Sequence, residues 1–202
     1  MLDLNRLPSP LWILGTGTGV GKTHVSAGIA RAWAASGPAT YRKPFQTGVS
    51  GPEDPGADAA AVSGPNITVE AHLLLQAPLS PLAAARQEGR TLDLPAAAAW
   101  CLRPAPGRVL LEGVGGLMVP LAPKVHFLAW ATELGIPCVL VATGGLGTLN
   151  HTLLSAEALM LRGWRVEAVL LNPGADGTSP EVAEANAALL REFLPVPVHV
   201  ID

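Results

Sequence analysis

The sequence is poor in cysteine and in charge, and each shortage excludes a class of protein. Only Cys101 and Cys138 occur in 202 residues; they form no CxxC pair and fit a reducing cytoplasm better than a disulfide framework. Charged residues make up 14% and the net charge is −3, without a basic run, so we expect no nucleic-acid or polybasic membrane partner. No apolar stretch reaches the ~20 residues of a membrane helix, and the first residues lack a signal-peptide pattern. We therefore predict a cytoplasmic protein that does not bind membranes.

Hydrophobic residues, in contrast, are plentiful and make up 49% of the chain. That share is typical of a compact, well-buried globule. No stretch resembles a linker between two cores, so we predict a single domain over residues 1–202. A chain of this length buries roughly 70% of the surface that it exposes when unfolded. It needs no disulfide or structural metal to fold.

Short apolar runs alternate along the chain with longer segments of helical periodicity. We expect strands at residues 11–14, 40–45, 109–111, 137–142, 166–171 and 196–201. We expect helices at residues 23–35, 81–87, 94–102, 125–134, 149–161 and 181–193. Residues 48–66 are rich in glycine, proline and acids, and we expect a loop there with a short helix near 58–62.

This alternation predicts an α/β fold of the P-loop NTPase kind, with a mainly parallel sheet and helices on both of its faces. In such sheets ligands bind at the carboxyl ends of the strands. The polar residues that directly follow the predicted strands are therefore the first candidates for a functional site.

The strongest of these candidates is a glycine-rich loop between the first strand and the first helix. Residues 15–23 read Gly-Thr-Gly-Thr-Gly-Val-Gly-Lys-Thr. Glycines let backbone amides point at phosphate oxygens, and the following helix adds partial positive charge. Lys22 can reach the β- and γ-phosphates, and the Thr23 hydroxyl can hold magnesium. The spacing is a variant, because five residues separate Gly15 from Gly21, one more than in the common loop.

Lysine occurs only at positions 22, 43 and 124, so the second of these is conspicuous. We expect Lys43 at the end of the second strand, facing the phosphate loop. Its charge could stabilise phosphoryl transfer or hold an anionic substrate. The local sequence fits a solvated surface lysine equally well.

Acidic residues stand at two places where a magnesium ligand would be expected. Glu112 follows the buried run of residues 109–111, where P-loop proteins place a magnesium-binding acid. A capping or solvated glutamate is the alternative interpretation. Asp58 shares its loop with Glu53 and Asp54, and any of the three could simply be solvated. Together with Thr23, two acids would form an oxygen-rich shell for magnesium.

Four ordered segments, from about residue 11 to residue 172, resemble the dethiobiotin synthetase family. Residues 15–23 match the family's Gly-Thr-acid-Thr-x-Val-Gly-Lys-Thr loop, extra residue included. Residues 43–48 resemble its Lys-Pro-x-x-Ser/Thr-Gly segment, and residues 111–116 its Val-Glu-Gly-Ala-Gly-Gly segment, followed by a similar apolar-Pro-Leu at 119–121. Residues 146–151 resemble its Leu-Gly-x-Ile/Leu-Asn-His segment.

The resemblance implies a role for each matching residue. Lys22 and Lys43 would contact the ATP γ-phosphate and the reacting carbamate, with Thr18 and Thr47 beside them. Thr23, Asp58 and Glu112 would surround magnesium. The ATP site would comprise Gly17, Thr18, Gly19, Val20, Gly21, Lys22, Thr23 and, at the adenine, Asn172. The substrate diaminopelargonate would contact Lys43 and Thr47, and its distal carboxylate would bind Gly147, Thr148, Leu149 and Asn150 of the neighbouring subunit in a homodimer.

The implied reaction closes a cyclic urea from the diamine, carbon dioxide and ATP. One amine takes up carbon dioxide as a carbamate, whose oxygen attacks the γ-phosphate to give a carbamic–phosphoric anhydride. The second amine then attacks the activated carbon and phosphate leaves. No protein nucleophile is needed, which agrees with the lack of a convincing nucleophile–base pair in the sequence. His24 and His151 are interpreted as structural.

The chain departs from the family pattern in three respects. Gly17 replaces the loop's usual acid, and Asn172 is followed by Pro-Gly without a clear later Gly-x-Ile/Leu-Pro segment. The main alternative function is a switch ATPase of the partitioning or positioning class. Such proteins usually carry a second lysine inside the loop, whereas the corresponding residues 16–18 are Thr-Gly-Thr here, which counts against this alternative. Cobalamin-pathway amide synthetases, which need an extra glutaminase domain, and a nucleotide-binding module without catalysis are further alternatives.

Overall fold

The computed structural model describes residues 2–51, 54 and 56–201; Glu53 of the acidic loop lies outside them. The strands are β1 (Leu11–Gly15), β2 (Ala39–Thr47), β3 (Ile67–Leu75), β4 (Arg108–Glu112), β5 (Pro120–Ala122), β6 (Val125–His126), β7 (Cys138–Thr143), β8 (Val166–Asn172) and β9 (Val198–Val200). The helices are α1 (Lys22–Ala34), α2 (Ala57–Val62), α3 (Pro81–Gln87), α4 (Leu94–Leu102), α5 (Phe127–Thr132), α6 (Thr148–Met160) and α7 (Pro180–Phe193), with short 3-10 turns at Leu4–Arg6 and Pro173–Ala175.

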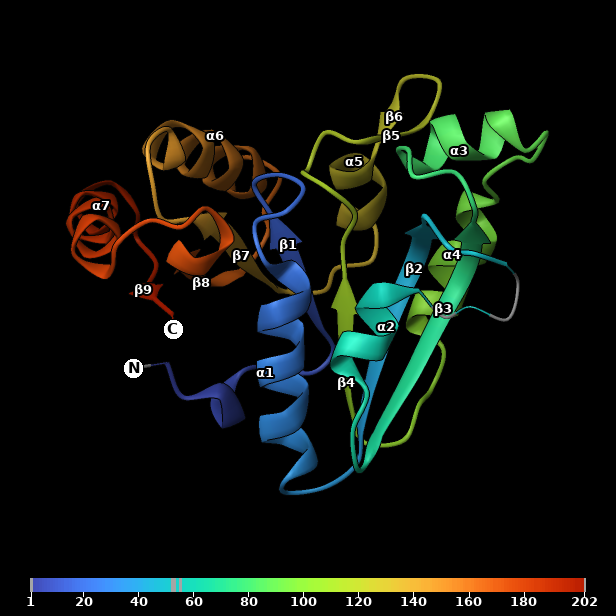
Figure 1. Ribbon diagram of the computed structural model, residues 1–202, viewed down its shortest axis with the longest axis horizontal. Coiled ribbons are helices and arrows are strands. Elements are labelled where there is room, and N and C mark those ends of the chain that lie inside the picture. The colour runs from blue at the N-terminus through green and yellow to red at the C-terminus, as the bar shows by residue number, and fades with distance from the viewer. Residues whose placement is uncertain (1, 52–53, 55, 202) are drawn as a thin grey trace.

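Seven strands form one parallel sheet in the order β3-β2-β4-β1-β7-β8-β9 (Figure 1). The chain starts in the middle of the sheet at β1, builds the β2–β3 side first and then crosses to β7, β8 and β9. The carboxyl ends of β1, β2 and β4 therefore meet at one edge. A separate antiparallel pair, β5 and β6, lies beyond this sheet.

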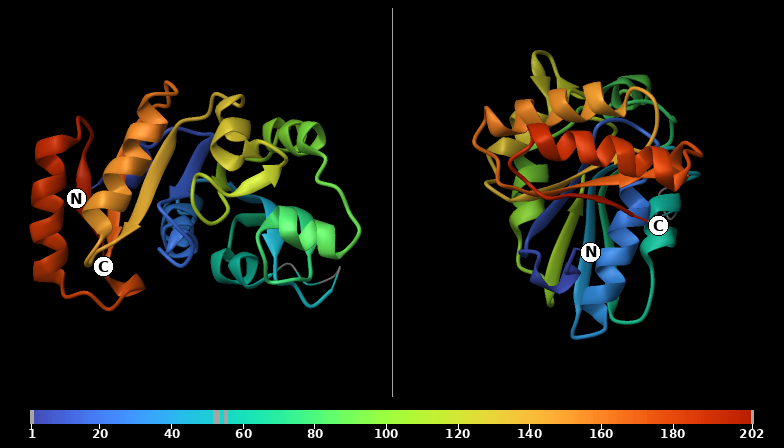
Figure 2. Two further views of the ribbon diagram at one scale, coloured as in Figure 1. Left: turned by 90° about the horizontal axis from the view of Figure 1, so that it is seen from above. Right: turned by 90° about the vertical axis from the view of Figure 1, so that its left-hand side faces the viewer.

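Helices cover both faces of the sheet, as the alternating pattern predicts (Figure 2). In β1, Leu11 and Ile13 join the core under α1 and α2, whereas Trp12 and Leu14 join the core under α3 to α7. This alternation follows from the two-residue period of a strand. Both faces of the central strand are thus buried, which confirms the predicted doubly covered parallel sheet.

The second strand is longer than its apolar run indicates, and this changes the position of Lys43. β2 continues to Thr47, so Lys43 lies within the strand and the prediction that it ends the strand is wrong. The neighbouring strand β4 stops at Glu112, and the register pairs Arg42 with Leu111. The next residues in register, Lys43 and Glu112, therefore meet where β4 ends. The position at which the two side chains meet is therefore determined by the end of β4, the shorter strand, and not by the end of β2.

Strand β3 has no counterpart in the sequence prediction. It pairs with β2 along its whole length but forms the edge of the sheet, and most of its side chains are only half-buried. Glu70 and His72 interrupt its apolar pattern. An edge strand with one face exposed to solvent lacks the continuous apolar run by which buried strands are recognised.

Three smaller predictions can be compared directly with the structure. The helix expected from residue 125 begins at Phe127, because Val125 and His126 form β6. The strand expected at residues 137–142 is present as β7, in which Cys138 is fully buried. Burial raises the pKa of Cys101 to about 12. Among the described residues, no helix is long and apolar enough to cross a bilayer.

Candidate functional site

The glycine-rich loop joins β1 to α1 at the carboxyl edge of the sheet. Gly21 precedes α1 with a φ of 94°, in the left-handed region. A Cβ at this position would lie 1.9 Å from Nδ2 of Asn172. That Nδ2 donates to the Val20 carbonyl at 3.2 Å. The end of β8 therefore braces the loop, and only glycine fits at position 21.

Lys22 extends from the first turn of α1 across the loop. Its Nζ donates to the carbonyls of Gly17 at 2.9 Å and Gly115 at 2.8 Å. The turn after β4 packs closely here, since a Cβ at Gly116 would lie 3.1 Å from the Thr16 carbonyl. Burial lowers the pKa of Lys22 to about 8, although the charge of Glu112 opposes this shift. The lysine thus stands at the mouth of the loop where phosphate oxygens would bind.

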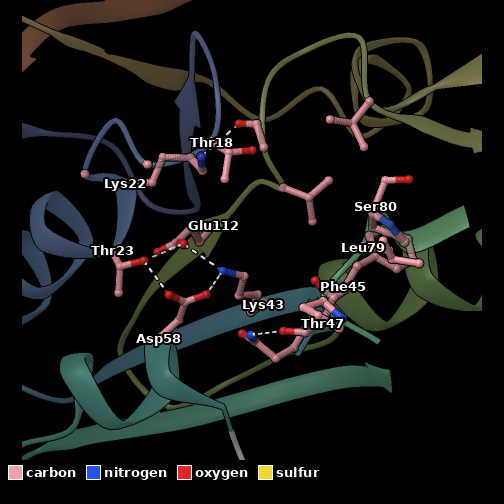
Figure 3. Close-up of a pocket in the computed structure, with 18 residues that line it drawn as sticks. Thr18, Lys22, Thr23, Lys43, Phe45, Thr47, Asp58, Leu79, Ser80 and Glu112 are labelled. Carbon is pink, nitrogen blue, oxygen red and sulfur yellow. Dashed lines mark hydrogen bonds and ion pairs between the residues drawn. The ribbon is translucent and has the colours of Figure 1, made fainter. Parts of the chain in front are cut away.

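Three oxygen-bearing side chains converge just inside the loop (Figure 3). The Thr23 hydroxyl lies 2.9 Å from Oδ1 of Asp58 and 2.9 Å from Oε1 of Glu112. They come from α1, α2 and β4, segments far apart in the sequence. The structure thus brings together the three residues for which the sequence predicts a magnesium shell.

Lys43 lies against the same two carboxylates. Its Nζ donates to Oε1 of Glu112 at 2.9 Å and to Oδ2 of Asp58. Burial alone would lower the pKa of Lys43, but the charges of Glu112 and Asp58 outweigh it and raise that pKa. Burial would likewise raise the pKa of Asp58, and Lys43 holds it below its usual range. The buried position excludes the alternative of a solvated surface lysine.

The oxygen atoms of Thr23, Asp58 and Glu112 are of the type that magnesium prefers as ligands. Mg²⁺ prefers oxygen ligands, uses one or two carboxylates and completes its shell with water and phosphate oxygens. Thr23, Asp58 and Glu112 offer one hydroxyl and two carboxylates within a single hydrogen-bonded group. In the described part of the chain, no group of three or more His, Cys, Asp or Glu side chains is arranged so that it could hold a metal ion by itself. An all-protein metal cage is therefore not the arrangement present in those residues.

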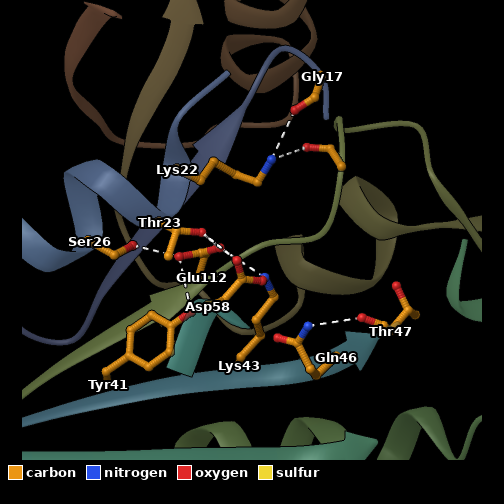
Figure 4. Close-up of polar contacts among 11 residues, drawn as sticks. Gly17, Lys22, Thr23, Ser26, Tyr41, Lys43, Gln46, Thr47, Asp58 and Glu112 are labelled. Atoms are coloured by element: carbon orange, nitrogen blue, oxygen red, sulfur yellow. Dashed lines mark hydrogen bonds and ion pairs between the residues drawn. The ribbon is translucent and has the colours of Figure 1, made fainter. Parts of the chain in front are cut away.

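Two further hydroxyls contact Glu112 from the core side (Figure 4). Ser26 Oγ donates to Oε2 at 2.8 Å, and the Tyr41 hydroxyl donates to the same oxygen at 3.0 Å. Neither residue was among the predicted site residues. The sequence spacing could have indicated them. Ser26 lies one helical turn after Thr23, and Tyr41 lies two strand residues before Lys43, so each shares a face of its element with a predicted site residue. Burial, and then the charge of Glu112, raises the pKa of Tyr41 far above its ordinary value.

A cavity of about 560 Å³ opens in front of these groups. Thr18 and Thr47 line it beside Lys22 and Lys43, so the four predicted catalytic residues share one cavity. The apolar part of the cavity wall was not predicted from the sequence; it comprises Phe45, Pro78, Leu79, Pro81, Val114 and Val119. These residues follow or flank strands but carry no chemistry of their own, which explains why no motif indicated them.

Several predicted binding residues lie outside this cavity. Gly147 precedes α6 with a φ of 90°, and the buried Thr148 donates to the Thr143 carbonyl at 2.7 Å. Asn150 is exposed nearby. Val20 buries its side chain in the core, so it can offer a ligand only backbone atoms. The 147–150 segment and Asn172 are thus at the same sheet edge but do not line the cavity.

A parallel sheet with this loop, two converging lysines and a buried acid defines a P-loop nucleotide-binding protein. The family described as "AAA domain" matches residues 10–200. The chain is 38% identical to the ATP-dependent dethiobiotin synthetase BioD of Acidiphilium cryptum, covering 96% of this chain and 93% of that one. It is 40% identical to the protein of the same name from Anaeromyxobacter sp. strain Fw109-5, covering 95% and 91%. The chain therefore belongs to the dethiobiotin synthetase family.

Solved structures with the same fold are far more distant in sequence. The septum site-determining protein MinD of Pyrococcus horikoshii, complexed with Mg-ADP, aligns with a TM-score of 0.55 at 17% identity, over 95% of this chain and 79% of that one. The cell division protein FtsY of Thermotoga maritima aligns with a TM-score of 0.54 at 18% identity, over 97% and 63%. At these identities the likeness establishes the fold and does not favour a switch function.

Proposed function

We infer that the chain is an ATP-dependent dethiobiotin synthetase, which closes a cyclic urea from diaminopelargonate, carbon dioxide and ATP. The observation that carries this inference is the pair of buried lysines, Lys22 and Lys43, which reach one cavity from α1 and β2. Family membership over nearly the whole chain supports the same activity. Both lysines are placed to stabilise negative charge, and the diamine and carbon dioxide supply the nucleophiles themselves.

In the proposed reaction the loop holds the triphosphate and Lys22 contacts its γ-phosphoryl group. Lys43 neutralises the carbamate that forms when one substrate amine adds to carbon dioxide and loses a proton. A carbamate oxygen then bonds to the γ-phosphorus as ADP leaves. The second amine attacks the carbamate carbon, loses its proton and expels phosphate, which closes the ring. Thr18 and Thr47, which both line the cavity, would orient the reacting groups.

Magnesium, when bound, would neutralise phosphate charge and align the transferring group. Thr23, Asp58 and Glu112 are the residues proposed to hold it. Lys43 donates to both carboxylates and so places a positive charge beside them. The protein's own contribution is therefore positioning and charge, with no covalent enzyme intermediate.

We also propose that two copies of the chain form a homodimer in which each supplies residues to the other's substrate site. The proposal is supported by the position of residues 147–150, which belong to no wall of their own chain's cavity. Leu146 beside them is completely exposed, and Leu154 and Leu161 extend the exposed apolar surface along and just beyond α6. Exposed apolar surface of this kind is typical of a contact region. The N-terminal end of α6 would then meet the distal carboxylate of the partner's substrate.

A cytoplasmic location is proposed as well. Both cysteines are free and buried, and the proposed reaction consumes ATP.

Diamine-dependent product formation tests the proposed function. Purified protein with magnesium, bicarbonate and ATP is followed by mass spectrometry, with and without diaminopelargonate. We expect phosphate release only with the diamine, and a product heavier than the diamine by one carbonyl group less two hydrogens. ATP turnover that ignores the diamine would instead indicate a switch ATPase.

A further inference from the structure

We propose that Tyr41 and Ser26 are positioning residues that hold one oxygen of Glu112, so that only the other oxygen faces the reaction site. The role rests on the proposed function in one respect, since it takes the site-facing oxygen to serve magnesium and the phosphoryl group. Neither residue belongs to the four motifs by which the family resemblance was recognised.

The two oxygens of Glu112 have separate sets of partners (Figure 4). Oε2 accepts from Ser26 at 2.8 Å and from Tyr41 at 3.0 Å. Oε1 lies 2.9 Å from Lys43 Nζ and 2.9 Å from the Thr23 hydroxyl. The carboxylate is thus divided into a core-facing oxygen with two neutral donors and a site-facing oxygen beside the functional groups.

The core-side donors are rigidly placed. Tyr41 and Ser26 are fully buried, and they come from β2 and α1, the elements that also carry Lys43 and Lys22. A carboxylate oxygen that accepts hydrogen bonds from two different elements holds the group in place, because rotation about its terminal bond would break both hydrogen bonds. The position of Oε1 relative to Thr23 and Lys43 is thereby fixed. Partners of this kind orient metal ligands, and their loss costs roughly 10- to 100-fold in metal affinity or activity.

A purely structural role would have different consequences. If the two hydroxyls served only to satisfy the buried oxygen of Glu112, their removal would lower stability without changing how magnesium binds. If both hold the same oxygen for the site, each partly replaces the other. The double variant should then exceed the product of the two single effects, as coupled residues do.

Magnesium-dependent nucleotide binding is the first test. The affinity for a non-hydrolysable ATP analogue is measured by calorimetry over a magnesium series for Tyr41→Phe, Ser26→Ala and the double variant. In the double variant, we expect a roughly 10-fold rise in the magnesium concentration that gives half of the increase in affinity for the analogue. Turnover should recover at high magnesium. Thr40→Val is the matched control, because it removes a neighbouring buried hydroxyl whose bond goes to the Pro106 carbonyl.

The second test uses the fact that Tyr41 is the only tyrosine of the chain. A ring ¹³C-labelled tyrosine gives resonances from this residue alone. They should shift in Glu112→Gln without ligand, and again in the wild-type protein when magnesium and the analogue are added. A folded control, Glu184→Gln on the surface of α7, should leave them unchanged.

The proposal is overturned if the double variant binds magnesium and analogue as the wild type does, or if the tyrosine resonances ignore Glu112→Gln. These outcomes are independent of the reaction. Failure of the wild type to make dethiobiotin would refute the proposed function, and the binding series and the resonances would still decide the role of the two hydroxyls.

Discussion

Lys43 is the residue on which the proposed chemistry depends most. It is buried between Asp58 and Glu112, and its charge is the counter-charge that the structure gives to both carboxylates. Its side chain also lines the cavity, where a carbamate would need a cation. Lys43 thus stabilises the two carboxylates when no ligand is bound, and its position in the cavity wall makes it accessible to an anionic substrate.

Replacing Lys43 should therefore separate catalysis from nucleotide binding. We expect Lys43→Met to lower kcat by roughly 100-fold or more, as the loss of one preorganised charge donor does. Affinity for ADP should stay within a few-fold, because the loop and Lys22 are untouched. Lys43→Arg should not rescue turnover, since a planar guanidinium cannot take the place of a compact ammonium. Steady-state kinetics and ADP titration measure the two effects, and an equal loss of both would contradict this assignment.

Two glycines only seven residues apart should respond in opposite ways to alanine. At Gly21 an added Cβ meets Asn172 at 1.9 Å and the φ of 94° is strained, so Gly21→Ala should destabilise the fold and weaken nucleotide binding. At Gly28, inside α1, an added Cβ meets nothing within 4 Å. Gly28→Ala should raise the free energy of unfolding by about 1 kcal/mol, through helix propensity alone. Thermal and urea denaturation decide both, and a tolerated Gly21→Ala would show that the loop is not braced as described.

Among the elements, α4 and the edge strand β3 are tied to β2 by one buried arginine. Arg42 donates to Glu70 at 2.8 Å and to the carbonyls of Cys101 and Arg103 at the end of α4. Arg103 also contacts Glu70 at 2.8 Å. These three charged residues fasten β3 and the end of α4 to β2, the strand that also carries Lys43.

The stability of this region should depend on pH through Glu70. Burial would raise the pKa of Glu70, but hydrogen bonds from Arg42 and Arg103 hold it below its usual range. The stabilisation is then present above the unfolded value of about 4.3 and is lost as the pH falls through the folded pKa. Glu70→Gln should cost on the order of 2 kcal/mol at pH 7, discounted for partial exposure, and nothing below the folded pKa.

Denaturation of Glu70→Gln at neutral and acidic pH, beside the exposed-pair control Glu184→Gln, measures this effect. The control should change stability by less than about 0.5 kcal/mol at either pH. A cost for Glu70→Gln that persists unchanged in acid would show that the ionic form is not what stabilises the strand.

The elements that the sequence predicted correctly share a physical reason, and so do the strand and the residues that it missed. Buried parallel strands and the glycine loop are local patterns, and the loop's position between strand and helix follows from them. β3 was missed because its burial depends on a neighbour rather than on its own composition. Tyr41, Ser26 and the apolar cavity wall were missed because their roles arise only when β2, α1 and β4 come together.

At the scale of the whole molecule, the proposed shared site makes a prediction about mixed dimers. Lys43→Met removes the reaction centre, and Asn150→Ala removes a proposed contact from the partner. Each variant alone should be inactive or strongly impaired. An equal mixture, after subunit exchange, should regain about a quarter of the wild-type sites, because one site in each mixed dimer is intact. No recovery after verified exchange would mean that the site lies within one subunit.

The central claim is that the protein phosphorylates a carbamate rather than water, and oxygen transfer tests it most directly. Short incubations in unlabelled water use ¹⁸O-bicarbonate, ATP, magnesium and diaminopelargonate, and the released phosphate is analysed by mass. The carbamate oxygen that attacks the γ-phosphorus leaves with the phosphate, so we predict one ¹⁸O in the phosphate for each cyclic urea formed. Unlabelled phosphate released at the same rate with or without the diamine would contradict the account and indicate simple hydrolysis.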